Sequence, residues 1–444
     1  MTNTAKQLDL PGVPRAKQGR EVPQKWAWTE AAVWTERMLA ALERGEKGSK
    51  WFSLIDKVYR EATLEKALQA VVSNGGAAGV DGESTQRLKA QAADVVSSLA
   101  RQLSEDRYEP KPVKRVWIDK LGSADKRPLG IPATRDRVVQ TALVYVLEPI
   151  WEREFAKHSY GFRPGHSAQQ AIARVEGLLK EGYTWVVDAD LKGYFDTIPQ
   201  DKLMAAVAEK IADSRVLRLV EKFLQQGVME TGKGWTPTEK GTPQGAVLSP
   251  LLANLYLNPL DHLMANTGRQ MTRYADDFVI QCRSEAEAQE ALEAVRQWVA
   301  RAGLTLHPDK TRIVDASQPG GFEFLGWHFE RGWKWPREKS VKRFREVLRL
   351  DTPRNHGESM MEIIHGLNRR LRGWGRYFAG GNGNIYSALD GWIRMRLRSI
   401  LRQRDRRKGR GHGRDHNRYP NAYFAELGLI SLNALNQAQR ANRA

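Results

Sequence analysis

Apolar positions recur at helical spacing through most of the first hundred residues and then switch to the shorter period of strands. Three amphipathic segments predict helices: residues 31–44, 64–72 and 84–103. Gly45 ends the first helix and the pair Gly75 and Gly76 ends the second, since glycine favours helix termini. Two alternating segments around a glycine-containing turn then predict a hairpin formed by residues 113–118 and 127–131.

From residue 183 onward, strand and helix periods alternate. The order is a strand at 183–187, helices at 202–211, 215–225 and 249–264, a hairpin with Asp276 and Asp277 at its tip, a helix at 285–302 and a strand near 304–307. This order approximates β-α-β-β-α-β, the split arrangement of a ferredoxin-like sheet, so the sequence predicts an α+β fold. Many functions use that fold, and the pattern alone leaves the activity open. Beyond residue 336 the pattern is helical and rich in arginine, with helices at 361–378 and 389–403.

The charge balance of the chain indicates what kind of partner it binds. The chain holds 70 Lys and Arg against 52 Asp and Glu, a formal net charge of +18. Such an excess favours a polyanionic partner, with nucleic acid ahead of an acidic membrane, and a solvated basic face is the bland alternative. The apolar-rich segment 138–151 is broken by polar residues, and the polar amino-terminal segment does not have the pattern of a signal peptide. We therefore expect a cytoplasmic protein without a membrane span.

Acidic residues gather where the predicted strands end. Asp276 and Asp277 occupy the hairpin tip, where an isolated pair more often bonds to its own turn backbone. Asp190 follows the strand at 183–187, which neighbours the hairpin in a split sheet. Two close carboxylates repel each other, and a divalent cation held by hard oxygen ligands relieves that repulsion, so we expect Mg²⁺ here, with Mn²⁺ as a substitute. A pair of such ions, about 3.5 to 4 Å apart, supports nucleotidyl transfer.

Three other residues bear on the same site. Asp188 is the competing ligand, because it lies two residues before Asp190 on the same side of an extended strand. We rank Asp190 first because it stands five residues before Phe195, whose ring could close over the sugar of a nucleotide, although a lone aromatic is more often a core residue. Residues 241–250 combine glycines and prolines with Gln244 directly ahead of a helix, a turn that suits a nucleotide or phosphate.

Together these stretches resemble the reverse transcriptase family, and within it the bacterial group II intron reverse transcriptase/maturases of the short class that lacks an HNH endonuclease. The matching motifs lie at residues 127–132, 159–165, 190–196, 241–250, 274–277, 304–310, 324–326 and 367–378. The resemblance runs from residue 51 to the carboxyl end and implies a right-hand polymerase. Its parts would be fingers at 51–182, a palm with the catalytic site at 183–335, a helical thumb or maturase (X) domain at 336–410 and a basic segment at 411–444, after an unassigned arm and helix at 1–50.

The resemblance also implies roles for single residues. The catalytic metal ligands would be Asp190, Asp276 and Asp277, the last being the weakest candidate of the three. Lys120 and Arg127 would offset the charge of a bound dNTP triphosphate, Phe195 would act against ribonucleotides, and Gln244 would line the nucleotide pocket. Four arginines are candidates for the RNA backbone, each weighed against a plain surface arginine: Arg163, Arg369, Arg372 and Arg376.

The function that this resemblance implies is that of an RNA-directed DNA polymerase that binds group II intron RNA, assists its splicing and copies it into cDNA during retrohoming. Its partners would be the intron RNA, an RNA template-primer, target DNA and dNTPs. Cys282 is the only cysteine, which excludes an internal disulfide and the paired cysteines of an HNH endonuclease. Two alternatives stay open: a splicing maturase with secondary polymerase activity, and a free-standing reverse transcriptase used in host defence or repair.

Overall fold

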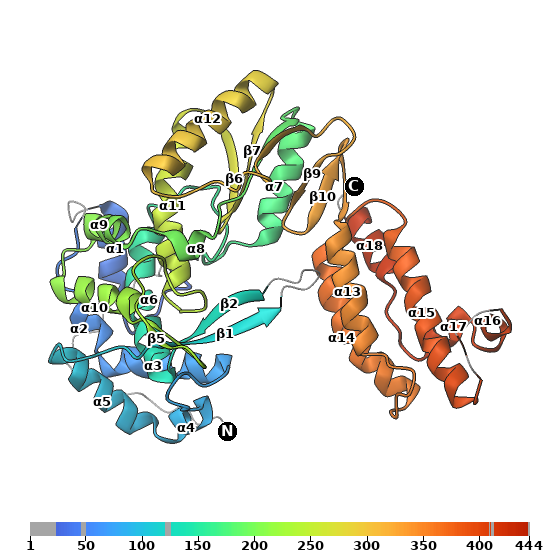
Figure 1. Ribbon diagram of the computed structural model, residues 1–444, viewed down its shortest axis with the longest axis horizontal. Coiled ribbons are helices and arrows are strands. Elements are labelled where there is room, and N and C mark those ends of the chain that lie inside the picture. Colours follow the sequence, from blue (N-terminus) through green and yellow to red (C-terminus); the bar gives the residue numbers. More distant parts are fainter. Residues whose placement is uncertain (1–23, 46–49, 120–125, 408, 410–412, 443–444) are drawn as a thin grey trace, which may run out of the picture.

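The computed structural model describes residues 24–45, 50–119, 126–407, 409 and 413–442. Its elements form three groups, and a hairpin of the first group projects toward the third (Figure 1). We call these groups fingers, palm and thumb, and define each by its elements below. The mixture of strand-containing fingers and palm with a largely helical thumb confirms the predicted α+β fold class.

Helices dominate the fingers. They are η1 (Gln24–Trp26), α1 (Glu36–Arg44), α2 (Ile55–Val58), α3 (Glu61–Asn74), α4 (Thr85–Ala90), α5 (Ala92–Ser104), α6 (Thr134–Glu152), α9 (Gln200–Lys210) and α10 (Ser214–Gln225). The apolar-rich segment 138–151 lies within α6, and its residues Val138, Leu143 and Val146 are wholly buried. This segment therefore forms a core helix. Among the described residues, every helix is too short or too polar to cross a membrane.

The predicted hairpin at residues 113–131 is present and belongs to a larger sheet. β1 (Val113–Asp119) and β2 (Lys126–Ile131) are antiparallel, and their register runs from Lys114↔Ile131 to Asp119↔Lys126. Two short strands extend the sheet in the order β2-β1-β4-β5, namely β4 (Val228–Glu230) and β5 (Gly234–Thr236). These two strands lie in the range predicted for the palm, yet they join the fingers through parallel pairing of β1 with β4.

The palm contains the predicted ferredoxin-like sheet. Its strands β3 (Trp185–Ala189), β6 (Gln270–Tyr274), β7 (Asp277–Cys282) and β8 (Arg312–Asp315) lie in the order β6-β7-β3-β8, and every neighbouring pair is antiparallel. The predicted strand near 304–307 is wrong, because Leu306 makes only an isolated bridge to Leu191 and the outer strand begins at Arg312.

Helices cover both faces of this sheet. The palm helices are α7 (Ala168–Lys180), α8 (Tyr194–Thr197), α11 (Ser249–Asn266) and α12 (Glu285–Arg301). Alternate residues of β3 point to opposite faces, so Val187 packs in the core that contains α12 while Val186 packs in the core that contains α7. α7 lies in the range predicted for the fingers, but it packs on β6 and β7 of the palm.

The thumb begins with a small antiparallel sheet and continues as helices. The sheet has the order β11-β10-β9, with β9 (Phe322–Phe324), β10 (Trp327–Glu330) and β11 (Trp333–Pro336). The helices are α13 (Glu338–Leu350), α14 (Met360–Phe378), α15 (Ile385–Arg404), α16 (Arg414–Arg418), α17 (Asn421–Glu426) and α18 (Leu432–Ala441). α18 packs on α14 and α15, so the helical group extends past residue 410, where we had predicted that the thumb ends.

Candidate functional site

The turn that joins β6 to β7 presents Asp276 at the edge of the palm sheet. Ala275 adopts φ 59°, which closes the turn between the paired residues Tyr274 and Asp277. Nη1 of Arg273 donates to the carbonyl oxygen of Ala275 at 2.8 Å, and the rest of that guanidinium is paired with Asp261. A fully buried arginine therefore supports this turn from beneath, a support that we did not predict from the sequence.

Residues 158–161, which precede α7, also hold this turn in place. Backbone bonds from Tyr160 N to Arg273 O (2.8 Å) and from Arg273 N to His158 O (3.0 Å) align the segment with β6. At Gly161 a side chain is impossible, because a Cβ there would collide with the backbone nitrogen of Ala275. The glycine of the segment 159–165 thus lets two backbones approach closely at the turn.

Asp190 and Asp276 line one cavity of about 340 Å³. Asp190 directly follows β3, and β3 pairs with β7 up to Ala189↔Phe278, which brings the two strand ends together. Burial raises the pKa of Asp276, and the charge of Asp190 raises it further, while Arg127 and Arg273 act in the opposite direction. The structure thus brings together two of the three predicted metal ligands.

Asp277 and the competing ligand Asp188 do not line that cavity. Burial raises the pKa of Asp277 to about 7, and Asp188 and Asp276 add to the shift. Burial also raises the pKa of Asp188 to about 6, against the influence of Arg312, whose Nε lies 3.4 Å from its Oδ2. This placement supports our ranking of Asp190 above Asp188 and of Asp277 last, and the ligand set itself stays a proposal.

The donors in the cavity fit a hard divalent cation. They are carboxylate oxygens that repel each other, and Mg²⁺ prefers oxygen ligands and relieves such repulsion. Within the described residues, no group of three or more His, Cys, Asp or Glu side chains is arranged to hold a metal ion. Two carboxylates fill only part of the coordination shell of Mg²⁺, so a cation at Asp190 and Asp276 would leave positions for water and for the phosphates of a nucleotide.

Lys310 enters the cavity as a partner of Asp190. Its Nζ lies 2.5 Å from Oδ2 of Asp190, and both residues line the same space. A hydrogen bond of 2.7 Å from His307 N to Asp190 O holds the backbone before Lys310 beside Asp190. The sequence motif at 304–310 contains this lysine, but the contact spans 120 residues of chain and we did not predict it.

The predicted nucleotide residues surround the same cavity. Arg127, Phe195 and Gln244 all line it. Nε2 of Gln244 donates to Oδ2 of Asp196 at 2.9 Å, which fixes the orientation of the amide. Gly241 adopts φ 79°, and a Cβ there would collide with the carbonyl oxygen of Phe195, so the turn needs glycine at this position. The remaining candidate, Lys120, lies outside the described residues.

Arg163, which we predicted as a contact to the RNA backbone, is occupied by partners within the protein. Its side chain is buried, and each of its three nitrogens donates within the protein. Nη2 pairs with Glu152 at 2.7 Å, and Nη1 donates to the carbonyl oxygens of Ala156 and Ser159. The sequence shows a glycine-flanked arginine, but the tertiary partner on α6 that occupies it is invisible in the motif.

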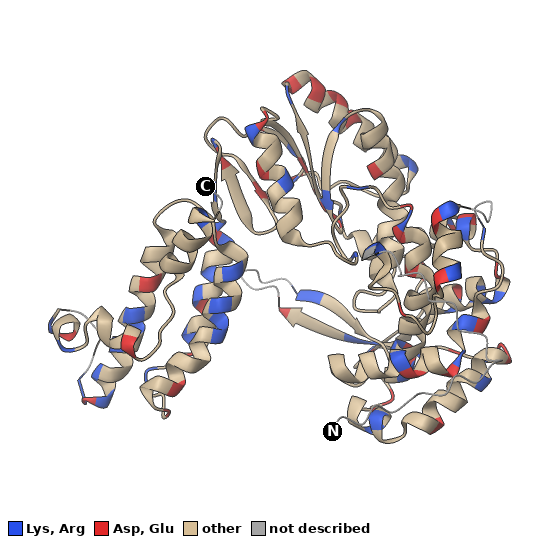
Figure 2. Cartoon of the chain, turned by 180° about the vertical axis from the view of Figure 1, so that it is seen from behind, with Lys and Arg blue, Asp and Glu red and all other residues tan. Residues whose placement is uncertain are grey.

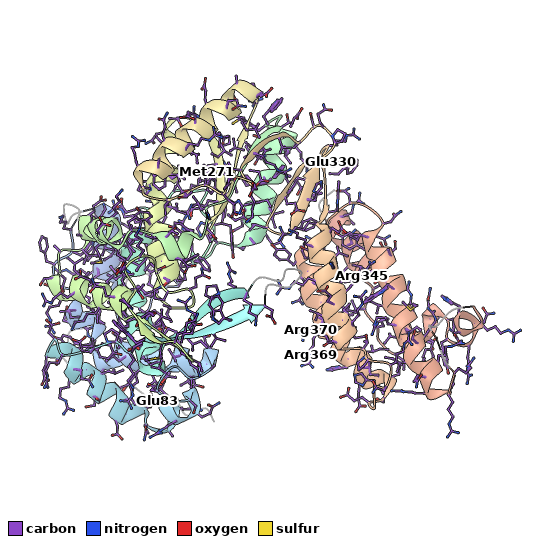
Figure 3. All side chains as sticks on the ribbon, viewed as in Figure 1. Glu83, Met271, Glu330, Arg345, Arg369 and Arg370 are labelled. Atoms are coloured by element: carbon purple, nitrogen blue, oxygen red, sulfur yellow. The ribbon has the colours of Figure 1, made fainter. Side chains whose placement is uncertain are left out.

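Arg369, Arg372 and Arg376 are exposed on α14. Their spacing of three and four residues places them on one face of the helix. None of them has an ion pair or hydrogen bond within the part of the chain that the structure describes, whereas their neighbour Arg370 pairs with Asp351 at 3.3 Å. Figure 3 shows Arg369 on the edge of the thumb nearest the fingers, and Figure 2 shows how Lys and Arg gather along these helices.

A second basic cluster, not predicted from the sequence, lies between α13 and α15. The guanidinium groups of Arg345, Arg349 and Arg396 lie 5.7, 5.9 and 5.5 Å from the centre of the Trp392 ring. Within the described residues no carboxylate pairs with any of the three, and the buried Nε of Arg345 has no hydrogen-bond partner. The charges of Arg349 and Arg354 and above all burial lower the pKa of Arg396. This cluster is uncompensated positive charge around an aromatic ring.

Comparisons with known proteins agree with this geometry. Residues 118–329 match the family described as reverse transcriptase (RNA-dependent DNA polymerase), and residues 341–419 match the group II intron maturase-specific domain. Protein YkfC of Escherichia coli (strain K12) is 34% identical over 342 residues, which cover 68% of this chain and 84% of that protein. The group II intron-encoded protein LtrA of Lactococcus lactis subsp. cremoris is 37% identical over 256 residues, which cover 54% of this chain and 41% of LtrA, so the chain spans less than half of that relative.

Among solved structures, a chain of a partial Cas6-RT-Cas1–Cas2 complex is 27% identical, with a TM-score of 0.36. That match covers 56% of this chain and 41% of the other.

Proposed function

The chain belongs to the reverse transcriptase family and carries a group II intron maturase domain, and from this premise we propose that it copies intron RNA into cDNA and assists the splicing of that RNA. The observation that carries the proposal is the meeting of Asp190 and Asp276 in one cavity at the ends of neighbouring palm strands. The residues that line this cavity all lie inside the segment that matches the reverse transcriptase family. Retrohoming into target DNA would be the natural outcome of the two activities.

The proposed chemistry is nucleotidyl transfer at this cavity. Asp190 and Asp276 would hold Mg²⁺, with Asp277 behind them, and the bound ions would activate the primer hydroxyl and stabilise the leaving oxygen. Arg127 and Lys310, both in the cavity wall, bring positive charge to where a triphosphate would lie.

Two further residues of the chain would select and orient the nucleotide. Phe195 lines the cavity, and its ring would lie against the sugar of a bound nucleotide and disfavour a 2′-hydroxyl. Gln244 lines the cavity and donates to Asp196, a bond that would help to orient its amide toward a nucleotide. The chain's own contribution is thus position, charge and exclusion around the reacting groups.

The thumb would hold RNA at two surfaces. The exposed arginines of α14, which have no partner among the described residues, suit the phosphates of a template-primer duplex, since Arg369 faces the fingers. The cluster around Trp392 suits a phosphate of a folded RNA, because an anion would neutralise three neighbouring guanidinium groups that already face an aromatic ring. Both surfaces belong to the segment that matches the maturase domain.

The test separates the two activities. The full chain is incubated with RNA transcribed from the DNA that flanks its coding sequence, and splicing is measured beside primer extension on the same RNA. We expect wild-type protein to promote both, Asp276→Asn to promote splicing alone, and Arg345→Gln/Arg349→Gln to extend a short template but promote splicing poorly. Extension without splicing by the wild-type chain would favour a free-standing reverse transcriptase, and splicing without extension would overturn the polymerase assignment.

A further inference from the structure

The turn between β9 and β10 is a meeting point of palm and thumb. Leu325 and Gly326 form it, with φ of 47° and 84°. The thumb binds Gly326 from the start of α13, where Arg337 N and Ser340 Oγ donate to its carbonyl oxygen at 3.0 and 3.1 Å. Leu325 is a bulky residue in the left-handed region, a conformation that persists only where its surroundings impose it. Several contacts must therefore hold this turn in place.

One of those contacts is the hydroxyl of Tyr377. It donates to the carbonyl oxygen of Leu325 at 2.8 Å, from the last turn of α14. The backbone carbonyl of the same tyrosine accepts from Nε2 of Gln169 on the palm helix α7, also at 2.8 Å. Tyr377 is thus bound to the β9–β10 turn at one end and to the palm at the other, and it lies on the helix that carries Arg369, Arg372 and Arg376.

The other side of the Leu325 peptide faces the catalytic turn. β9, which leads into Leu325, packs against β7 of the palm, and the Leu325 backbone acts to lower the pKa of the Asp277 carboxyl. The Tyr377 hydroxyl itself is close enough to this turn that Tyr274 and Asp277 add to the effect of burial in raising the pKa of Tyr377 to about 12. One residue, Leu325, therefore lies between a thumb hydroxyl and a palm aspartate.

We propose that Tyr377 is a positioning residue that couples the seating of α14 on nucleic acid to the placement of the Tyr274–Asp277 turn through Leu325. The coupling rests on the proposed polymerase function. When the exposed arginines of α14 engage a duplex, the helix fixes the Leu325 carbonyl, and the packing of β9 on β7 in turn fixes the strand that starts at Asp277. Asp276, the proposed metal ligand, directly precedes Asp277 in the turn, so its placement follows.

A matched pair of variants isolates this coupling. Tyr377→Phe removes the oxygen that reaches Leu325 and keeps the ring. Tyr386→Phe is the control, because its hydroxyl donates to the carbonyl oxygen of Phe378 at 2.6 Å within the thumb, and within the described residues no hydrogen bond joins it to the β9–β10 turn. Each variant loses a hydrogen bond that its hydroxyl donates to a main-chain carbonyl, so both should lower Tm.

The first readout is independent of polymerase activity. Hydrogen exchange of the peptides that contain residues 274–280 and 322–330 should quicken in Tyr377→Phe and stay at the wild-type rate in Tyr386→Phe. Equal exchange in the two variants would overturn the coupling, whether or not the protein synthesises cDNA. An inactive wild-type protein with the expected exchange difference would instead count against the proposed function alone.

The second readout is single-nucleotide addition to a bound primer. Tyr377→Phe should lower kcat about fivefold, the effect of roughly one hydrogen bond, with KM for the dNTP unchanged and Tyr386→Phe at the wild-type rate. A loss confined to KM for the dNTP, or the same kcat in both variants, would overturn the proposal. A purely structural role for Tyr377 would move both variants equally.

Discussion

Arg273 and Asp261 form an ion pair that is wholly enclosed in the palm, with Nη2 of the arginine 2.5 Å from Oδ2 of the aspartate. The same guanidinium donates to Asn254 at 2.9 Å and to the carbonyl oxygen of Ala275 at 2.8 Å. Because Ala275 precedes Asp276, this pair connects the interior of the palm to the turn that carries Asp276. Arg273 directly precedes Tyr274 in β6, so the residue that supports the turn lies in the strand that leads into it.

Removing one member of this pair should destabilise the protein strongly. Asp261→Ala leaves a buried charge without its partner, and we expect a loss of about 3 to 5 kcal/mol in the free energy of unfolding. Denaturant unfolding of the wild type and the variant measures this loss of free energy. The control is Glu290→Ala, which breaks the exposed pair with Arg269 and should cost less than about 1 kcal/mol. Similar losses in the two variants would show that Arg273 does not depend on Asp261.

Phe195 should decide between the sugars. Phe195→Ala opens the cavity beside Asp190 and Gln244, and we expect the preference for dNTP over rNTP in kcat/KM to fall by roughly 10- to 100-fold. Phe195→Tyr keeps a ring in place and should keep the preference. If Phe195→Ala discriminates as the wild-type chain does, the ring is a core residue and another group reads the sugar.

Asp136 should make stability depend on pH. Burial raises its pKa to about 6, from an ordinary value of 3.8, although Tyr108 and the backbone of Lys111 act in the opposite direction. The folded state therefore binds the proton more tightly than the unfolded chain. The resulting stabilisation is present at low pH and is lost as pH rises through about 6, by roughly 1 kcal/mol between about pH 5 and pH 7.

Asp136→Asn removes this titration and leaves every other group in place. The difference in unfolding free energy between wild type and Asp136→Asn should shift by that amount over the same range, in favour of the variant at the higher pH. Other buried carboxylates, such as Asp188, cancel in the difference. A difference that does not change with pH would show that Asp136 is ionised in the folded protein throughout.

The α14 arginines should show themselves in the salt dependence of RNA binding. Arg372→Gln/Arg376→Gln should flatten the slope of log affinity against log salt by about 0.7 to 0.9 for each lost phosphate contact. The control Arg296→Gln/Arg301→Gln removes the same charge from the palm helix α12 and should keep the wild-type slope. Equal slopes in the two double variants would assign RNA binding to a different surface.

The sequence was sufficient where a local period or a strand end carried the information. Asp190 and Asp276 were found because antiparallel pairing of adjacent strands brings such ends together, and the hairpin of β1 and β2 followed from alternation around one turn. Residues 304–307 were wrongly predicted as a strand. Their apolar residues alternate as in a strand, but the backbone pairs only at Leu306.

Contacts between distant segments were beyond sequence reasoning. Lys310 reaches Asp190 across the fold, and β1 reaches β4 although more than a hundred residues separate them. Arg163 shows the same limit from the other side, because its motif suggested an exposed cation and only the fold reveals the carboxylate of Glu152 beside it. The cluster around Trp392 draws its arginines from two helices, so no single stretch of sequence displays it.

Primer extension by Asp276→Asn tests the central claim most directly. Purified full-length protein is given an RNA template with an annealed DNA primer, dNTPs and Mg²⁺, and Asp315→Asn, at the far end of β8, serves as the matched control. We expect wild type and the control to extend the primer, and Asp276→Asn to bind the same template-primer with unchanged affinity but to extend it at least about a thousandfold more slowly. Extension by Asp276→Asn at the wild-type rate would contradict the account.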